Sequence, residues 1–275
     1  MIFEPSAAVY GMLRGSTPAW AAVAVLLVLF FGGSVGSFVA AAARRLLDGR
    51  SVIGPRSHCE SCGSVLGARD LVPLVSFLLL QGRCGSCNEP LERSDFLVEW
   101  IGALVAVLLL VATTGGVEFW RGSCLLVILG IATITDLEAR RIPLPVSWSG
   151  IIMGLVWAAI SGAGALGSHL LALVITVGVL AGLNAAYVKL RRVEVAFGGG
   201  DVRLAGAIAA FLGPEGAPIA LIVAATAGSL FGIVAILLGR ATLRSAIPFG
   251  PFLALGGALV VFGEPALWGL LSIVD

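Results

Sequence analysis

Residues Trp20–Ala43 read WAAVAVLLVLFFGGSVGSFVAAAA and contain no charged side chain. A helix rises about 1.5 Å per residue, so a run of this length can cross the roughly 30 Å hydrocarbon core of a bilayer. The run is too long for the core of a secretory signal peptide, and no cluster of basic residues precedes it. We therefore interpret it as a retained transmembrane helix.

The rest of the chain has the same apolar character. Charged residues make up 12% of the 275 residues, whereas 59% are hydrophobic. Soluble domains carry about twice this charged fraction. We expect an all-α polytopic membrane protein with about eight spans, and the net charge of +1 gives no indication of a nucleic-acid partner. The predicted spans are Trp20–Ala43, Phe96–Thr113, Ser123–Thr135, Leu144–Ile160, His169–Tyr187, Asp201–Leu212, Pro218–Leu238 and Ile247–Phe262.

Basic residues predict the orientation, because short loops rich in Lys and Arg remain in the cytoplasm. With the N-terminus outside, the cytoplasmic side holds fifteen basic residues and the outside holds two, Arg14 and Arg121. We therefore expect both termini outside. The fifteen are Arg44, Arg45, Arg50, Arg56, Arg69, Arg83, Arg93, Arg140, Arg141, Lys189, Arg191, Arg192, Arg203, Arg240 and Arg244.

A polar loop, residues 44–95, separates the first two predicted spans and contains four of the five cysteines. They form two CxxC pairs, Cys59 with Cys62 and Cys84 with Cys87. Two such pairs can supply four thiolates to one structural Zn²⁺, and the cytoplasm keeps thiols reduced. Because so short a loop has too small a core to fold well alone, a metal would stabilise it. We predict a cytoplasmic zinc-ribbon-like loop; CxxC pairs with a redox role, or with no function, are the alternative.

Three further features, namely Cys124, His58 and the apolar stretch Leu71–Leu80, are not expected to belong to the metal site. Cys124 begins a predicted span and is expected to be a small packing residue. His58 is expected to be an exposed loop residue, although it could compete as a metal ligand. The apolar stretch Leu71–Leu80 contains Pro73 and is too short to cross a membrane, so we expect it to form a small core or to lie on the membrane surface.

Two aspartates are predicted to lie at the cytoplasmic ends of separate spans. Asp136 ends the third span, where it could be only an interfacial charge paired with Arg140 at i+4. Asp201 follows three glycines and begins the sixth span, where a carboxylate could act only as a helix N-cap. Their common face and depth favour a functional role instead, because acidic residues near the membrane interior are costly and rare.

A pair of carboxyl groups at such a place predicts a specific chemistry. Two close carboxyl groups cannot both ionise at low cost, so they share one proton. One group can then activate water while the other protonates the scissile carbonyl or the leaving amine. Asp136 and Asp201 are therefore candidates for an aspartate dyad that hydrolyses a peptide bond without a covalent intermediate or a catalytic metal.

Several short sequence elements are distributed along nearly the whole chain. They are Gly36–Phe38 (GSF), Pro55–Gly63 (PRSHCESCG), Leu71–Phe77 (LVPLVSF), Gly82–Cys87 (GRCGSC), Leu97–Glu99 (LVE), Asp136, Gly198–Leu204 (GGGDVRL) and Pro248–Ala254 (PFGPFLA). In content and order these elements resemble those of the bacterial type IV prepilin peptidases, which process type IV pilins and type II secretion pseudopilins.

The resemblance implies that Asp136 and Asp201 are the catalytic aspartates of a GxGD-type peptidase in the bacterial inner membrane, with its catalytic face in the cytoplasm. Such enzymes cleave a short, basic leader after a glycine, just before the hydrophobic helix of the substrate. Many members then methylate the new N-terminal residue with S-adenosylmethionine, and Gly82 and Glu99 are candidate residues of that second site. The resemblance implies two regions: residues 20–113, which contain the cysteine loop and the methyl-transfer region, and residues 122–262, the peptidase domain.

One departure and three alternatives accompany this resemblance. Arg203 stands where the family usually has Lys, which keeps the positive charge but replaces a compact ammonium by a planar guanidinium. The chain could be a peptidase without methylation. It could be a proton-coupled transporter, which would also place acidic residues in spans, although we see no clear internal repeat. It could also be a zinc-stabilised scaffold without catalysis.

Overall fold

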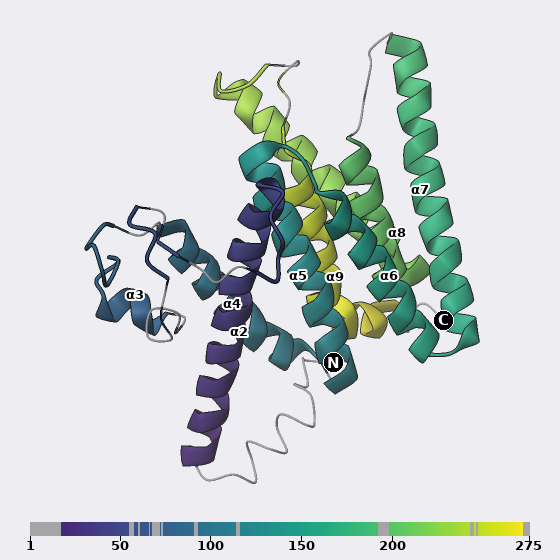
Figure 1. Ribbon diagram of the computed structural model, residues 1–275. Coiled ribbons are helices and arrows are strands. Elements are labelled where there is room, and N and C mark those ends of the chain that lie inside the picture. Colours follow the sequence, from purple (N-terminus) through teal and green to yellow (C-terminus); the bar gives the residue numbers. More distant parts are fainter. Residues whose placement is uncertain are drawn as a thin grey trace. The chain divides into compact units, whose positions relative to one another are not determined.

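The computed structural model describes residues 18–271, except 55–57, 60, 66, 68–71, 73, 91–92, 114–115, 192–197, 243–244 and 246. Helices account for the regular structure of this part of the chain, so the predicted all-α class is confirmed (Figure 1). The helices are α2 (Pro18–Leu47), α3 (Val75–Leu79), α4 (Arg93–Ala112), α5 (Gly116–Ala139), α6 (Leu144–Ile160), α7 (Ala163–Arg191), α8 (Gly199–Leu237) and α9 (Gly250–Leu271).

Five of the described helices, α2, α4, α5, α7 and α8, are long and apolar enough to cross a membrane. The helix α6 and the Gly250–Gly263 part of α9 are apolar but shorter. The break in α8 at Gly213 divides it into two helical segments, which correspond to the sixth predicted span, Asp201–Leu212, and to the seventh, Pro218–Leu238, apart from its last residue. The number of spans therefore stays a prediction.

Some predicted features fall only partly on described residues. Within the apolar stretch Leu71–Leu80, residues Val75–Leu79 form α3. Leu71 and Pro73 lie outside the described residues, as do Pro55–Ser57 and Glu60 of the cysteine motif and the basic residues Arg14, Arg69, Arg192 and Arg244.

The chain divides into two compact units, Met1–Gly116 and Val117–Asp275. In the first unit α2 packs directly against α4 through glycines. A Cβ atom added at Gly102 would lie 2.4 Å from the carbonyl oxygen of Gly32 and 2.9 Å from the Cα of Gly36. Because these residues have no side chain, the two backbones approach closely, as is common between membrane helices. Arg44 of α2 also forms a half-buried ion pair with Asp95 in the first turn of α4.

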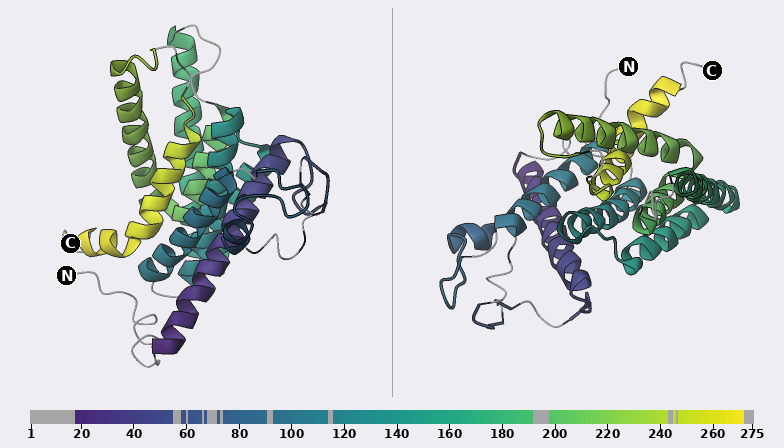
Figure 2. Two further views of the ribbon diagram at one scale, coloured as in Figure 1. Left: turned by 90° about the vertical axis from the view of Figure 1, so that its left-hand side faces the viewer. Right: turned by 90° about the horizontal axis from the view of Figure 1, so that it is seen from above.

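In the second unit α8 packs against α6, α7 and α9 (Figure 1, Figure 2). Its segment Leu204–Phe211 is almost completely buried. Glycines again permit close packing, since a Cβ atom added at Gly154 of α6 would lie 2.7 Å from the carbonyl carbon of Ala210, and one added at Gly256 of α9 would lie 2.1 Å from the carbonyl oxygen of Ala220. The first part of α8 is therefore held rigidly among its neighbours.

The α2–α4 contact predicts that Gly102→Leu destabilises the protein. The new side chain would collide with the backbone of α2, and such overpacking should lower the melting temperature in detergent by about 5 °C or more. Gly178→Leu in α7 is the matched control, because no atom lies within 4 Å of a Cβ atom built at that glycine. Equal melting temperatures for the two variants would contradict the proposed close contact.

Candidate functional site

Asp136 lies in the last turn of α5 and is only 5% exposed. Its Oδ2 accepts a hydrogen bond of 2.7 Å from the N–H of Gly250, at the start of α9. The helix ends three residues later because Arg140 adopts a left-handed backbone, with φ of 50°. A negative charge is unfavourable near a helix C-terminus, so the burial of a carboxyl group here costs free energy. A costly group in such a place indicates a functional role.

Asp201 lies in the first turn of α8 and is half-buried. Gly198 is the N-cap residue, and Asp201 is the third helical residue, so Asp201 is not itself the N-cap. The N–H of Gly198 donates a hydrogen bond to the Asp201 carboxyl group. This is the reciprocal contact of a capping box, which stabilises the start of a helix. Phe197, which precedes the motif, lies outside the described residues.

The second unit brings the two carboxyl groups together closely enough for their charges to interact. Glycine backbone surrounds both. A Cβ atom added at Gly250 would lie 2.8 Å from Oδ2 of Asp136, and one added at Gly198 would lie 2.9 Å from Oδ2 of Asp201. Real Cβ contacts are essentially never so short, so a larger residue at either position would displace a carboxyl group.

The loop after α5 also contacts the start of α8. A Cβ atom added at Gly200 would lie 3.1 Å from the Cβ of Ile142, so the glycines of the Gly198–Gly200 run permit close approach on two sides. The sequence indicated Gly198 and Gly250 only as members of motifs. The contact of Gly250 with Asp136 is tertiary and could not be inferred from spacing, whereas that of Gly198 with Asp201 is a local contact within the first turn of α8.

Arg203 follows Asp201 by two residues and folds back toward the start of α8, where a Cβ atom added at Gly199 would lie 3.3 Å from its Nη1. Its Nε is buried and has no hydrogen-bond partner among the described residues. A cation at a helix N-terminus opposes the helix dipole. Arg203 nevertheless places a partly buried positive charge near the start of α8, whose first turn carries Asp201.

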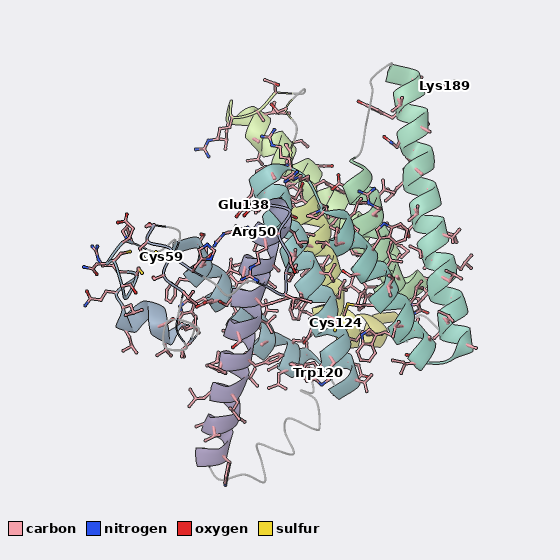
Figure 3. All side chains as sticks on the ribbon, in the orientation of Figure 1. Arg50, Cys59, Trp120, Cys124, Glu138 and Lys189 are labelled. Atoms are coloured by element: carbon pink, nitrogen blue, oxygen red, sulfur yellow. The ribbon has the colours of Figure 1, made fainter. Side chains whose placement is uncertain are left out.

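The four cysteines of the predicted metal site come together in the first unit, in two similar turns. Cys59 accepts a backbone hydrogen bond from Gly63, and Cys84 accepts one from Asn88, with lengths of 2.8 and 2.9 Å. Gly63 and Asn88 both have left-handed backbones, with φ of 69° and 61°. Isolated β-bridges, His58 with Val65 and Arg83 with Pro90, flank the two turns. Figure 3 shows Cys59 in this loop.

The sulfur positions fit a tetrahedral zinc ion. All four Sγ atoms lie within 4.8 Å of one another, and those of Cys59 and Cys87 are 3.8 Å apart. Zn–S bonds of about 2.3 Å in a tetrahedron imply S–S distances of about 3.8 Å. Hydrogen bonds from the backbone N–H groups of Cys87 and Ser86 lower the pKa of the Cys84 thiol to about 6, whereas desolvation and the neighbouring sulfur atoms raise the pKa of the Cys87 thiol to about 12. Four thiolates at such short distances repel one another, so the cluster needs a cation to hold all of them deprotonated. The chemistry of this donor set therefore suits zinc.

Gly82 and Glu99 both support the cysteine loop. The Oε2 atom of Glu99 accepts a hydrogen bond of 2.8 Å from the N–H of Leu74. Leu74 has a φ of 64°, which is rare for a residue with a large side chain, so the Glu99 contact helps to hold a strained turn before α3. Gly82 adopts a φ of 69° shortly before Cys84. Their predicted role in cofactor binding stays a prediction.

Cys124 and His58 lie apart from any metal ligand set in the described residues. Cys124 lies on α5 (Figure 3) and is half-buried. Its thiol interacts with the side chain of Trp157 of α6. The described cluster of potential metal ligands consists of the four loop cysteines, without His58.

Two family models match the chain in succession. Residues 30–113 match the bacterial peptidase A24 N-terminal domain, which includes the four cysteines. Residues 123–233 match the type IV leader peptidase family, which includes Asp136 and Asp201. No solved structure matches the chain.

Curated relatives agree with these matches. The chain is 35% identical to the prepilin leader peptidase/N-methyltransferase of Burkholderia pseudomallei over 221 residues, covering 77% of this chain and 68% of the relative. It is 33% identical to the enzyme of that name in Aeromonas salmonicida, covering 78% and 72%. With the enzyme of that name in Bacillus subtilis it shares 30% identity, covering 87% and 95%. The chain is therefore an integral membrane protein that belongs to the type IV leader peptidase family.

Proposed function

We propose that this enzyme cleaves the leader peptide of prepilins and pseudopilins, with Asp136 and Asp201 as its catalytic pair. The observation that supports the pair most strongly is the meeting of two carboxyl groups from separate helices, one of them almost fully buried, within range of each other's charge. The relatives named as prepilin leader peptidases support the substrate class.

The contacts of the two aspartates suggest how the pair acts as a general base and a general acid. The Gly250 N–H holds Oδ2 of Asp136, and the Gly198 N–H holds the carboxyl group of Asp201. The pair shares one proton, because two close carboxylates repel each other. The ionised group removes a proton from water, which attacks the scissile carbonyl carbon, while the protonated group donates its proton to the carbonyl oxygen. As the C–N bond breaks, the leaving amine takes the proton that the first carboxylate removed from water, and the hydroxyl group of the intermediate returns its proton to the second carboxylate.

The proposed membrane arrangement suits this substrate. We place the chain in the inner membrane with eight spans, both termini outside, and the aspartates at the cytoplasmic face. The bias of basic residues supports this orientation. A basic leader would then remain in water while the hydrophobic helix that follows it remains in lipid, so the scissile bond lies at the boundary.

We further propose that residues 20–113 form the region of a second activity, N-methylation of the new terminus, and residues 122–262 the peptidase domain. The relatives named N-methyltransferases support this activity. S-adenosylmethionine would supply an electrophilic methyl group to the new amine. The one observed side-chain contact of Glu99 supports the loop turn at Leu74, so no step of methyl transfer is assigned to Glu99 or Gly82.

Zinc is the metal that we propose for the cysteine loop, with Cys59, Cys62, Cys84 and Cys87 as its ligands. It would be structural, since four thiolates leave no open position for a substrate or a water molecule. It would hold the two turns together where the loop has little apolar core.

Replacing either aspartate by its amide should abolish leader cleavage. Asp136→Asn and Asp201→Asn keep side-chain size but remove the shared proton and the negative charge, so turnover should fall about a thousandfold or more. Mass spectrometry of a synthetic peptide with a basic leader, a glycine and a hydrophobic segment would measure cleavage and its position. Glu138→Gln is the matched control, because Glu138 is exposed in the same turn of α5 as Asp136 (Figure 3). Mature-length product formed at the wild-type rate by either amide variant would remove the pair as the catalyst.

A methyl group beside either aspartate should also slow cleavage. Gly250→Ala and Gly198→Ala place Cβ atoms at 2.8 and 2.9 Å from carboxylate oxygens, and a displacement of about 1 Å can lower turnover about a hundredfold. Gly167→Ala, where no atom lies within 4 Å of the added Cβ, should keep the wild-type rate. Unchanged turnover in both of the first two variants would mean that these glycines do not shape the site.

Metal analysis would test the cysteine loop separately. The purified protein should contain about one zinc per chain, and Cys59→Ser or Cys84→Ser should lose most of it and make the loop more sensitive to proteolysis. Cys124→Ser is the control, because its thiol lies outside the four-sulfur cluster. Elemental mass spectrometry gives the zinc content. Wild-type protein without zinc, or equal loss in the Cys124→Ser control, would contradict the proposed ligand set.

A further inference from the structure

We propose that His169 of α7 is a positioning residue for the catalytic pair. It supplies the hydrogen bond that Pro214 cannot make, and it thereby stabilises the break in α8 at the far end of the helical segment that carries Asp201. This inference rests on the proposed function of Asp201. The contacts that support it lie between α7 and α8 within the second unit.

The break in α8 lies at Gly213, where φ is 69° and ψ is −167°. This backbone region is essentially restricted to glycine. Pro214 follows at once, and proline has no N–H group. In a continuous helix the N–H of residue 214 would donate to the carbonyl of Ala210, four residues earlier. The Ala210 carbonyl therefore loses its helical donor, although Ala210 is completely buried.

The imidazole ring of His169 occupies this position. Its Nδ1 lies 2.9 Å from the Ala210 carbonyl oxygen. Since a carbonyl oxygen can only accept, Nδ1 must carry the proton of this bond. The ring also lies against the break itself, because a Cβ atom added at Gly213 would be 2.8 Å from Nε2 and 3.1 Å from both Cδ2 and Cε1. One side chain thus satisfies the free carbonyl and packs against the glycine that frees it.

The position of this contact connects it to Asp201. Ala210 is nine residues beyond Asp201 in the same helical segment, which corresponds to about 13.5 Å along the axis. The segment between them is buried, and Gly154 of α6 packs against Ala210 while Leu173 and Val177 of α7 pack against Gly206. A rigid segment that is clamped at one end transmits any change there to its other end. Loss of the His169 bond should therefore alter the distance between Asp201 and Asp136.

The tautomer of His169 gives a test that does not depend on activity. The chain has only two histidines, so ¹⁵N-histidine labelling gives two ring systems by NMR. We expect one of the two rings to be the tautomer that carries its proton on Nδ1. His169→Asn should remove the resonances of that ring. A His169 ring protonated only at Nε2 would overturn the proposed hydrogen bond.

Kinetics would test the consequence for Asp201, with the synthetic leader peptide as the substrate. His169→Ala should lower kcat about tenfold and leave KM nearly unchanged, because the ring does not bind substrate. His169→Asn retains a side-chain N–H donor and should recover most of the lost kcat. Ser168→Ala is the control, since the Ser168 hydroxyl donates its hydrogen bond to the Ala165 carbonyl of its own helix.

The possible results are distinguishable from a failure of the proposed function. If the wild type cleaves the peptide and His169→Ala has the wild-type kcat, the positioning role is wrong and the aspartate pair stands. If His169→Asn is as slow as His169→Ala although both are folded, the hydrogen bond is not what matters and the inference is again overturned. A wild type that does not cleave the peptide would overturn the proposed function, and with it the role of His169.

Discussion

The hydrogen bond between the Gly250 N–H and Asp136 is the contact on which the candidate active site depends. It joins residues 114 positions apart and ties the last turn of α5 to the first turn of α9. A carboxyl group that is almost completely buried needs such a partner, because an unpaired polar group in apolar surroundings is costly. Gly198 orients Asp201 in a similar way. Main-chain N–H groups hold both carboxyl groups, so the positions of these donors do not depend on the rotamer or the protonation of another side chain.

Close packing through glycine provides the frame that holds these contacts. In a membrane the lipid is as apolar as the helix surfaces, so helices associate through close contact and polar pairing rather than through burial from water. The α2–α4, α6–α8 and α8–α9 contacts all place a backbone where a larger residue would not fit. The first part of α8 carries the candidate residue Asp201, and its segment Leu204–Phe211 is almost completely buried, so close packing of this segment positions the candidate site.

The cysteine loop follows a different physical principle. Its two turns repeat the same hydrogen-bond pattern around Cys59 and Cys84, with a left-handed residue after each CxxC pair. The pattern is local, and it places four thiols where one metal ion could bind them all. A short polar loop can therefore keep a defined shape beside membrane helices without an apolar core of its own, while Glu99 attaches the turn at Leu74 to α4.

The sequence by itself determined the features that depend on local composition. Long apolar runs predicted the all-helical membrane class, and the CxxC spacing predicted the four-sulfur cluster, because hydropathy and knuckle spacing are properties of short segments. The two aspartates were recognised by their motifs and by their positions at the ends of apolar runs.

Only the tertiary structure decided which distant groups meet. The Gly250–Asp136 bond, the closeness of the two carboxyl groups and the contact of His169 with Ala210 all depend on how the helices pack. The break in α8 at Gly213 lies between the predicted spans Asp201–Leu212 and Pro218–Leu238, but its backbone geometry is visible only in the structure. Helix packing is set by the fit of whole surfaces, and no short stretch of sequence contains that information.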